Sequence, residues 1–131
     1  SFPFGRVKFV PAVHGSGITE AGVTIYGGVA VGIVIEIGGF RIYHAGDTGL
    51  TADMGLLEAL KIDLALLPIG GCYVMDIADA LRAVELVRPR KVVPMHYGTF
   101  PGIEADPGEF LAALPSWVEG ILLSPGERVS F

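Results

Sequence analysis

Residues 29–37 form an almost uninterrupted apolar run, rich in valine and isoleucine, that ends at Gly38-Gly39. Residues 41–44 follow directly as a second strand-like segment. Two apolar segments joined by a glycine pair predict a β-hairpin, because glycine readily adopts the left-handed backbone angles of a two-residue turn. This hairpin is the part of the sheet that the sequence predicts most directly.

Further strands and helices alternate along the chain. Strands are expected at residues 7–13, 63–67, 91–95, 121–123 and 128–131, and an irregular connector at residues 18–28. Helices are expected at residues 51–60, 77–87 and 107–114, with Asp76 and Asp106 as N-caps. The sequence thus predicts an α/β fold, one mixed sheet of six or seven strands with helices on one face. The other face is also apolar, so it must meet another surface.

Composition indicates a single unit with a large contact surface. The chain has 131 residues, the length of one domain. Its hydrophobic fraction of 51% and mean hydropathy of +0.58 are high for a small domain, which leaves much of its surface exposed. Every stretch of about 18 residues is interrupted by a charged residue, a glycine or a proline, so none is suited to span a membrane. We therefore expect a soluble protein without a membrane partner. The opening Ser1-Phe2-Pro3-Phe4 is more typical of the middle of a protein than of its start.

Charge and cysteine content narrow the choice of partner and compartment. Nine basic and fourteen acidic residues give a net charge of −5, without any lysine or arginine cluster. This balance argues against a nucleic-acid partner. Cys72 is the only cysteine, so an intrachain disulfide is excluded and a cytoplasmic location is expected.

Three candidate metal ligands each follow a predicted strand. His14 follows residues 7–13, Asp47 lies just beyond residues 41–44, and His96 follows residues 91–95. Loops at strand ends are where α/β folds gather catalytic groups. Imidazole and carboxylate are the usual ligands of zinc, manganese and iron in proteins. We therefore predict that these three side chains converge on a metal site.

Each candidate also has a structural explanation. A histidine at a strand end is often a hydrogen-bonded structural residue, which applies to His14 and to His96. Asp47 could cap the helix that begins near Thr51 or hold an Asx turn. The matching positions of all three residues favour the metal site.

Other residues are less promising. His44 lies within its strand and is offset from Asp47, so a hydrogen-bonding role is expected rather than ligation. Cys72 is expected to be a small buried residue. Gly70-Gly71 lacks the Gly-Lys-Ser/Thr sequence of a phosphate-binding loop. Ordinary packing is favoured over a substrate pocket for four aromatic residues, Tyr26, Tyr73, Tyr97 and Phe100.

Three motifs resemble a known family. They are Tyr43-His44-Ala45-Gly46-Asp47-Thr48-Gly49, Leu67-Pro68-Ile69-Gly70-Gly71 and Val93-Pro94-Met95-His96-Tyr97-Gly98-Thr99-Phe100. In this order the sequence resembles the C-terminal half of the metallo-β-lactamase superfamily, and it is most similar to metal-dependent hydrolases related to the ascorbate-phosphate lactonases.

The resemblance implies that residues 1–131 are one unit, half of an αββα sandwich with a two-metal site at one edge. His14 would be the histidine supplied between the halves. Asp47 would be the catalytic carboxylate that bridges both metals, and His96 the last histidine of the second metal. The expected cofactor is two zinc ions, with manganese or iron as alternatives. A hydroxide held between the metals would attack an ester, lactone or phosphoester of a small-molecule substrate.

The family signature His-x-His-x-Asp-His is absent from the chain. We therefore expect this chain to be inactive by itself and to need a complementary N-terminal half, on another chain or a second copy. The alternative is a non-catalytic interaction module that has lost the chemistry. RNA processing, a third activity of the superfamily, conflicts with the acidic balance.

Overall fold

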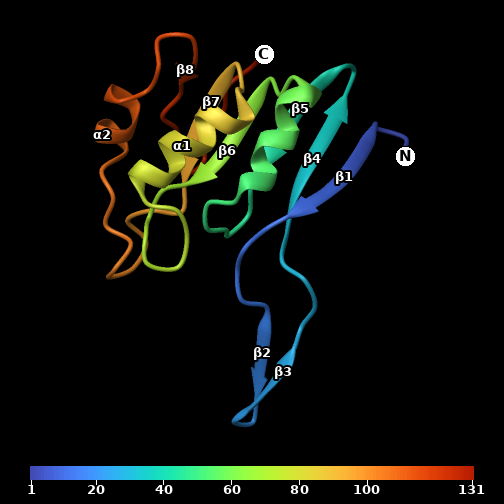
Figure 1. Ribbon diagram of the computed structural model, residues 1–131, viewed down its shortest axis with the longest axis vertical. Helices are drawn as coiled ribbons and strands as arrows, with labels where there is room; N and C mark the ends of the chain where they lie inside the picture. Colours follow the sequence, from blue (N-terminus) through green and yellow to red (C-terminus); the bar gives the residue numbers. More distant parts are fainter.

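A six-stranded mixed sheet forms the centre of the molecule (Figure 1). The computed structural model describes residues 1–131. The strands lie in the order β1 (Arg6–Pro11), β4 (Val31–Ile37), β5 (Phe40–His44), β6 (Leu64–Pro68), β7 (Lys91–Met95) and β8 (Glu119–Gly120). β1, β4 and β5 pair antiparallel, whereas β5 to β8 run parallel. The mixed α/β fold predicted from the sequence is confirmed.

The predicted hairpin is formed by β4 and β5. Ile37 pairs with Phe40, and the two residues between them are Gly38 at φ 58° and Gly39 at φ 87°. Positive φ at both central positions is the requirement of a type I′ turn, which glycine meets without steric cost.

Three helical segments cover one face of the sheet (Figure 1). They are the 3₁₀ helix η1 (Ala52–Leu60) and the α-helices α1 (Ile77–Val87) and α2 (Pro107–Ala112). The predicted N-caps form, since Asp76 accepts a hydrogen bond from the Asp79 N–H at 2.8 Å and Asp106 accepts one from Gly108 at 2.8 Å.

The core lies between these helices and one row of the sheet. Val34 pairs with Tyr43, Tyr43 with Ala65, and Ala65 with Val92, so these side chains share a face. All four are buried and pack with helical residues such as Val84 in one hydrophobic cluster.

The opposite face carries apolar side chains without helical cover. Phe9 pairs with Ile33 and Val7 with Ile35, one register position away from the buried row. Phe9 is 68% exposed. The C-terminal Phe131 stacks on Phe40 of this face, with ring centroids 5.2 Å apart. The prediction that helices cover only one face of the sheet is thus confirmed.

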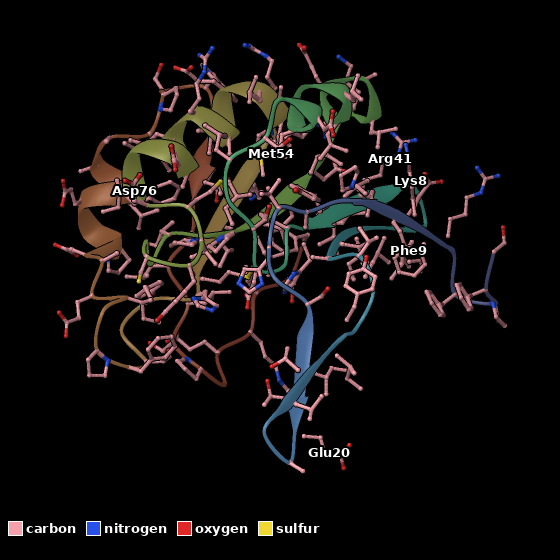
Figure 2. The ribbon with its side chains drawn as sticks, turned by 60° about the horizontal axis from the view of Figure 1, so that its bottom comes forward. Lys8, Phe9, Glu20, Arg41, Met54 and Asp76 are labelled. Carbon is pink, nitrogen blue, oxygen red and sulfur yellow. The ribbon has the colours of Figure 1, made fainter.

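Residues 18–28 form more than an irregular connector, so that prediction was wrong. They contain most of a second antiparallel pair, β2 (Gly17–Glu20) and β3 (Val23–Tyr26), joined at Ala21-Gly22. All residues of both strands are exposed. This short hairpin projects beyond the sheet (Figure 1), and Figure 2 shows Glu20 at its far end, so it buries no face that would mark it in the sequence.

The predicted strands at residues 121–123 and 128–131 are also wrong. The last strand is the two-residue β8, and beyond it Ile121 donates a single backbone hydrogen bond to Val92 at 2.9 Å. A turn closed by a hydrogen bond from the Glu127 N–H to the Ser124 carbonyl follows, and the chain ends at Phe131, which stacks on Phe40 of the sheet. No helix in the structure combines the length and apolar character needed to cross a bilayer.

Candidate metal centre

The three predicted ligands emerge at one edge of the sheet. β1 is antiparallel to β4 and β4 to β5, so β1 and β5 run in the same direction, and β7 is parallel to them through β6. The carboxyl ends of β1, β5 and β7 therefore share an edge, which lies towards the β2–β3 hairpin in Figure 1. His14, Asp47 and His96 each lie one to three residues beyond one of these ends.

Asp47 and His96 come closest to each other. Oδ1 of Asp47 lies 3.4 Å from Nε2 of His96, and their side chains are 48% and 25% exposed. A charge-assisted hydrogen bond is shorter, about 2.7–2.9 Å. The two groups are thus close together without forming a short charge-assisted hydrogen bond.

The structural explanations for Asp47 do not hold. Thr51, not Asp47, caps η1 by accepting a hydrogen bond from the Asp53 N–H at 3.4 Å. The Gly49 N–H, which an Asx turn would use, donates to the Val13 carbonyl at 2.9 Å. The Asp47 carboxylate is therefore free to bind something else.

His14 is attached to the same loop through its backbone. The preceding Val13 donates its N–H to Thr48 Oγ1 at 2.9 Å and accepts from the Gly49 N–H at 2.9 Å. The imidazole itself is exposed, with Nδ1 2.7 Å from the Gly15 carbonyl. Because a carbonyl only accepts, this hydrogen bond places a proton on Nδ1, which leaves Nε2 as the ring nitrogen available to a ligand.

The three side chains do not close into one cluster. No group of three or more histidine, cysteine, aspartate or glutamate side chains in the chain is placed to hold a metal ion. The structure brings together Asp47 and His96 and puts His14 at the same edge. The ligand roles of all three residues remain predictions.

His96 is held in an unusual backbone conformation. Its φ is 56°, in the left-handed region that non-glycine residues seldom occupy and that is often found at functional sites. Its Nδ1 is buried without a hydrogen-bond partner, so it is not the hydrogen-bonded structural histidine that was the alternative. The rings of His96 and Phe100 are nearly perpendicular, with centroids 6.2 Å apart.

Gly70 allows the chain to pass directly against His96. A Cβ on Gly70 would lie 2.3 Å from the His96 carbonyl oxygen, closer than any Cβ can approach. The Ile69 N–H also donates to the Met95 carbonyl at 3.0 Å. The Gly70-Gly71 pair thus has a packing role beside the candidate ligand.

The residues that were weaker candidates in the sequence have different environments in the structure. His44 Nδ1 accepts a hydrogen bond from the Gly46 N–H at 3.1 Å, the hydrogen-bonding role expected for it. Cys72 is exposed, so the prediction of a buried cysteine was wrong; it lies in a loop at φ 59° that turns its side chain outward. Of the four aromatic residues predicted to pack, only Tyr97 packs against the hydrophobic core. The other three are exposed, Tyr26 by 78%, Tyr73 by 64% and Phe100 by 45%.

Thr48 is an organising residue that sequence reasoning missed. It is 0% exposed, and its Oγ1 accepts from Val13 and donates to the Gly49 carbonyl at 2.8 Å. Its own carbonyl accepts from the Met75 N–H at 3.0 Å. Thr48 thereby joins the strand end before His14 to the loop that carries Asp47. The signal in the sequence that could have indicated this role is the position of the threonine directly after the candidate aspartate.

A half-parallel sheet covered by helices on one face, with histidine and aspartate at its carboxyl edge, defines a metallo-β-lactamase-like α/β protein. Residues 1–97 match the family described as the Beta-lactamase superfamily domain. The chain therefore belongs to the metallo-β-lactamase superfamily.

Individual relatives agree with this assignment. A UPF0173 metal-dependent hydrolase of Thermus thermophilus is 52% identical over 128 residues, which cover 96% of this chain and 55% of the relative. One from Enterococcus faecalis is 48% identical, over 98% of this chain and 56% of the relative. The chain spans about half the length of these relatives.

Solved structures show the same fold. Igni18, a metallo hydrolase from the hyperthermophilic archaeon Ignicoccus hospitalis, superimposes with a TM-score of 0.86 at 44% identity. The match covers 98% of this chain and 54% of Igni18.

Proposed function

We propose that this chain is the C-terminal half of a metal-dependent hydrolase that acts on an ester, lactone or phosphoester. The observation that carries the proposal is the pair formed by Asp47 Oδ1 and His96 Nε2, 3.4 Å apart at the carboxyl edge of the sheet. The relatives at 52% and 48% identity bear the name metal-dependent hydrolase, which supports a divalent metal at this edge.

The donor atoms fit a metal ion. Two ligand atoms that each lie about 2.1 Å from a tetrahedral zinc are about 3.4 Å apart, and the Asp47–His96 distance is 3.4 Å. His14 adds an exposed imidazole whose Nε2 lone pair is free. One carboxylate and two neutral imidazoles suit zinc, and also manganese or iron.

This donor set needs completion from outside these 131 residues. The chain has no cluster of three ligands. His96 Nδ1 is buried without a partner, although the second nitrogen of a ligating histidine almost always donates to a carboxylate, carbonyl or water. We infer that a complementary half, on another polypeptide or a second copy, supplies the remaining ligands.

The helix-free face of the sheet is where such a half would pack. Apolar side chains from β1, β4 and β5 line it, and some are far more exposed than core residues, with Phe9 at 68%, Ile37 at 48% and Val31 at 44%. Contiguous apolar surface of this kind usually marks a contact with another surface.

The residues of this chain would act as ligands and as one wall of the substrate site. When bound, the metal ions supply Lewis acidity and a water whose pKa falls towards about 7. Asp47 would contribute the negative charge that holds the ions, and His14 and His96 would contribute nitrogen donors. An open groove of about 400 Å³ beside His96, lined also by Tyr97 and Thr99, leaves room for a small substrate.

The test is to measure bound zinc, manganese and iron, and the hydrolysis of generic lactone and phosphodiester substrates. Both are measured for the chain alone and with the remainder of the Thermus thermophilus relative. We expect weak metal binding and no turnover alone, and tight binding with turnover after complementation. Tight binding of two metals with turnover by the chain alone would disprove the half-site proposal.

The exposed apolar face also fits a second candidate, a non-catalytic interaction module. That function predicts that the complementary half binds but that metal does not. It also predicts that His14→Ala, Asp47→Ala and His96→Ala cause no loss of stability.

A further inference from the structure

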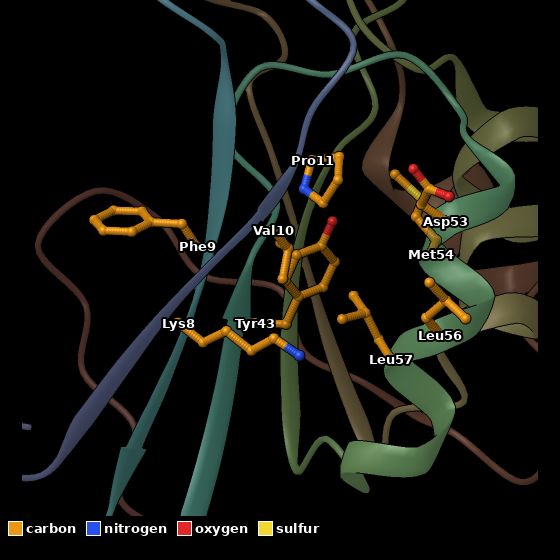
Figure 3. Close-up of a pocket in the computed structure, with 9 residues that line it drawn as sticks. All are labelled: Lys8, Phe9, Val10, Pro11, Tyr43, Asp53, Met54, Leu56 and Leu57. Carbon is orange, nitrogen blue, oxygen red and sulfur yellow. The ribbon is translucent and has the colours of Figure 1, made fainter.

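A separate cavity lies between the edge strand β1 and the helix η1 (Figure 3). Its volume is about 100 Å³. The lining is mainly apolar and includes Val10, Pro11, Met54, Leu56 and Leu57. It is on the helical side of the sheet, and none of the candidate metal ligands contributes to it.

The hydroxyl of Tyr43 is an unpaired polar group in this cavity. Tyr43 is 0% exposed, and its hydroxyl oxygen has no hydrogen-bond partner. Figure 3 shows this oxygen pointing into the space between Pro11 and Met54. An unsatisfied buried polar group costs about 1–3 kcal/mol and is rare in native proteins. A bound molecule with a hydrogen-bonding atom would remove this cost.

The chemistry of the cavity indicates what such a molecule is like. Burial raises the pKa of Tyr43 to about 12, so its hydroxyl is a neutral donor at physiological pH. Lys8 and Asp53 line the cavity with opposite charges, and neither forms an ion pair. Because their charges offset each other, the field favours neither an anion nor a cation.

Size and polarity then select the occupant. A cavity of about 150 Å³ in another protein holds benzene, which has six non-hydrogen atoms, so about 100 Å³ suits a compact body of about four non-hydrogen atoms. Six of the nine lining residues are hydrophobic, whereas a buried water needs about three hydrogen bonds. We propose that this cavity binds a small neutral amphiphile whose carbonyl or hydroxyl oxygen accepts a hydrogen bond from Tyr43.

Acetone, with four non-hydrogen atoms, is a suitable probe, and isobutene, in which a methylene group replaces the oxygen, is its hydrocarbon counterpart. Each is titrated into the isotope-labelled 131-residue chain while backbone amide shifts are followed by NMR. We expect saturable shifts at Val10, Tyr43, Met54 and Leu57, with the ketone binding about fivefold more tightly than the hydrocarbon because of one hydrogen bond.

Two variants separate the hydroxyl from the cavity. Tyr43→Phe removes only the hydroxyl and should weaken ketone binding about fivefold, to the level of the hydrocarbon. Tyr26→Phe, which removes an exposed hydroxyl, should change nothing. If the ketone gives no saturable shifts in the wild type, or binds no better than isobutene, the proposal fails. The wild-type comparison of the two probes decides this even if Tyr43→Phe does not fold.

Discussion

The Asp47 carboxylate and the His96 imidazole lie 3.4 Å apart, although their residues follow strands separated by β6. Two parallel steps, β5 to β6 and β6 to β7, bring the ends of these strands to one edge. The close backbone passage at Gly70 and the hydrogen bonds of Thr48 hold the loops on either side of this pair. The candidate centre thus depends on contacts between loops that are distant in sequence.

Asp47→Asn should weaken zinc binding by about tenfold or more, because the amide keeps the shape but loses the negative charge that attracts the cation. Isothermal titration of zinc into the wild type and the variant, each with the complementary half, measures this. Asp53→Asn removes an exposed carboxylate away from the pair and serves as the matched control. Equal affinities in Asp47→Asn and the wild type would exclude Asp47 as a ligand.

Thr48→Val should lower the free energy of unfolding by about 1–3 kcal/mol, because it keeps the shape but leaves the Val13 N–H without its acceptor. Thr48→Ser retains the hydroxyl and should recover most of the loss. Urea unfolding followed by circular dichroism gives both values. A Thr48→Val variant as stable as the wild type would show that this bond does not hold the loop.

Capping residues, proline and apolar periodicity explain why some elements were predicted with their exact bounds. Helix α1 begins after the Asp76 cap and ends before Pro89, and strand β7 matches the predicted residues 91–95. In both cases the apolar pattern and the residues at the boundaries indicate the same element, so its bounds could be predicted without knowledge of tertiary contacts. The β2–β3 hairpin was missed for the opposite reason, because neither strand buries a face and each has only four residues, too few for a clear apolar alternation.

The candidate site was predictable in its residues but not in its geometry. Strand-end positions identified His14, Asp47 and His96, whereas the Asp47–His96 contact depends on the parallel register of β5, β6 and β7. The role of Thr48 was hidden for the same reason, since its partner Val13 is 35 residues away.

Stability should fall at alkaline pH through Tyr43. Burial raises its pKa from 10.0 to about 12, so the folded state retains the proton that the unfolded state releases above pH 10. Stability is unaffected by this group below pH 10 and is lost between pH 10 and 12, by about 2–3 kcal/mol in all. Tyr43→Phe should flatten this slope in urea midpoints measured from pH 9 to 12, whereas Tyr73→Phe, at an exposed position, should not.

Gly70→Ala should disturb His96 without touching its side chain. The added Cβ would lie 2.3 Å from the His96 carbonyl oxygen and 2.8 Å from Ile103 Cβ. A backbone oxygen cannot move away as the end of a flexible side chain can, so we expect a loss of about 1–3 kcal/mol in unfolding free energy. His96 should also lose its left-handed conformation, which is visible in the shift of its backbone amide.

Gly55→Ala is the matched control for this change. Its Cβ would meet Leu86 Cδ2 at 3.7 Å, an ordinary contact, and alanine favours a helical backbone by about 0.5–1 kcal/mol. Gly55→Ala should therefore leave stability unchanged or raise it, with the His96 amide unmoved. If both alanine variants have the same stability and the same His96 shift, the passage of Gly70 against His96 does not position the candidate ligand. If only Gly70→Ala moves that amide and also weakens zinc binding with the complementary half, the backbone contact sets the direction of the imidazole.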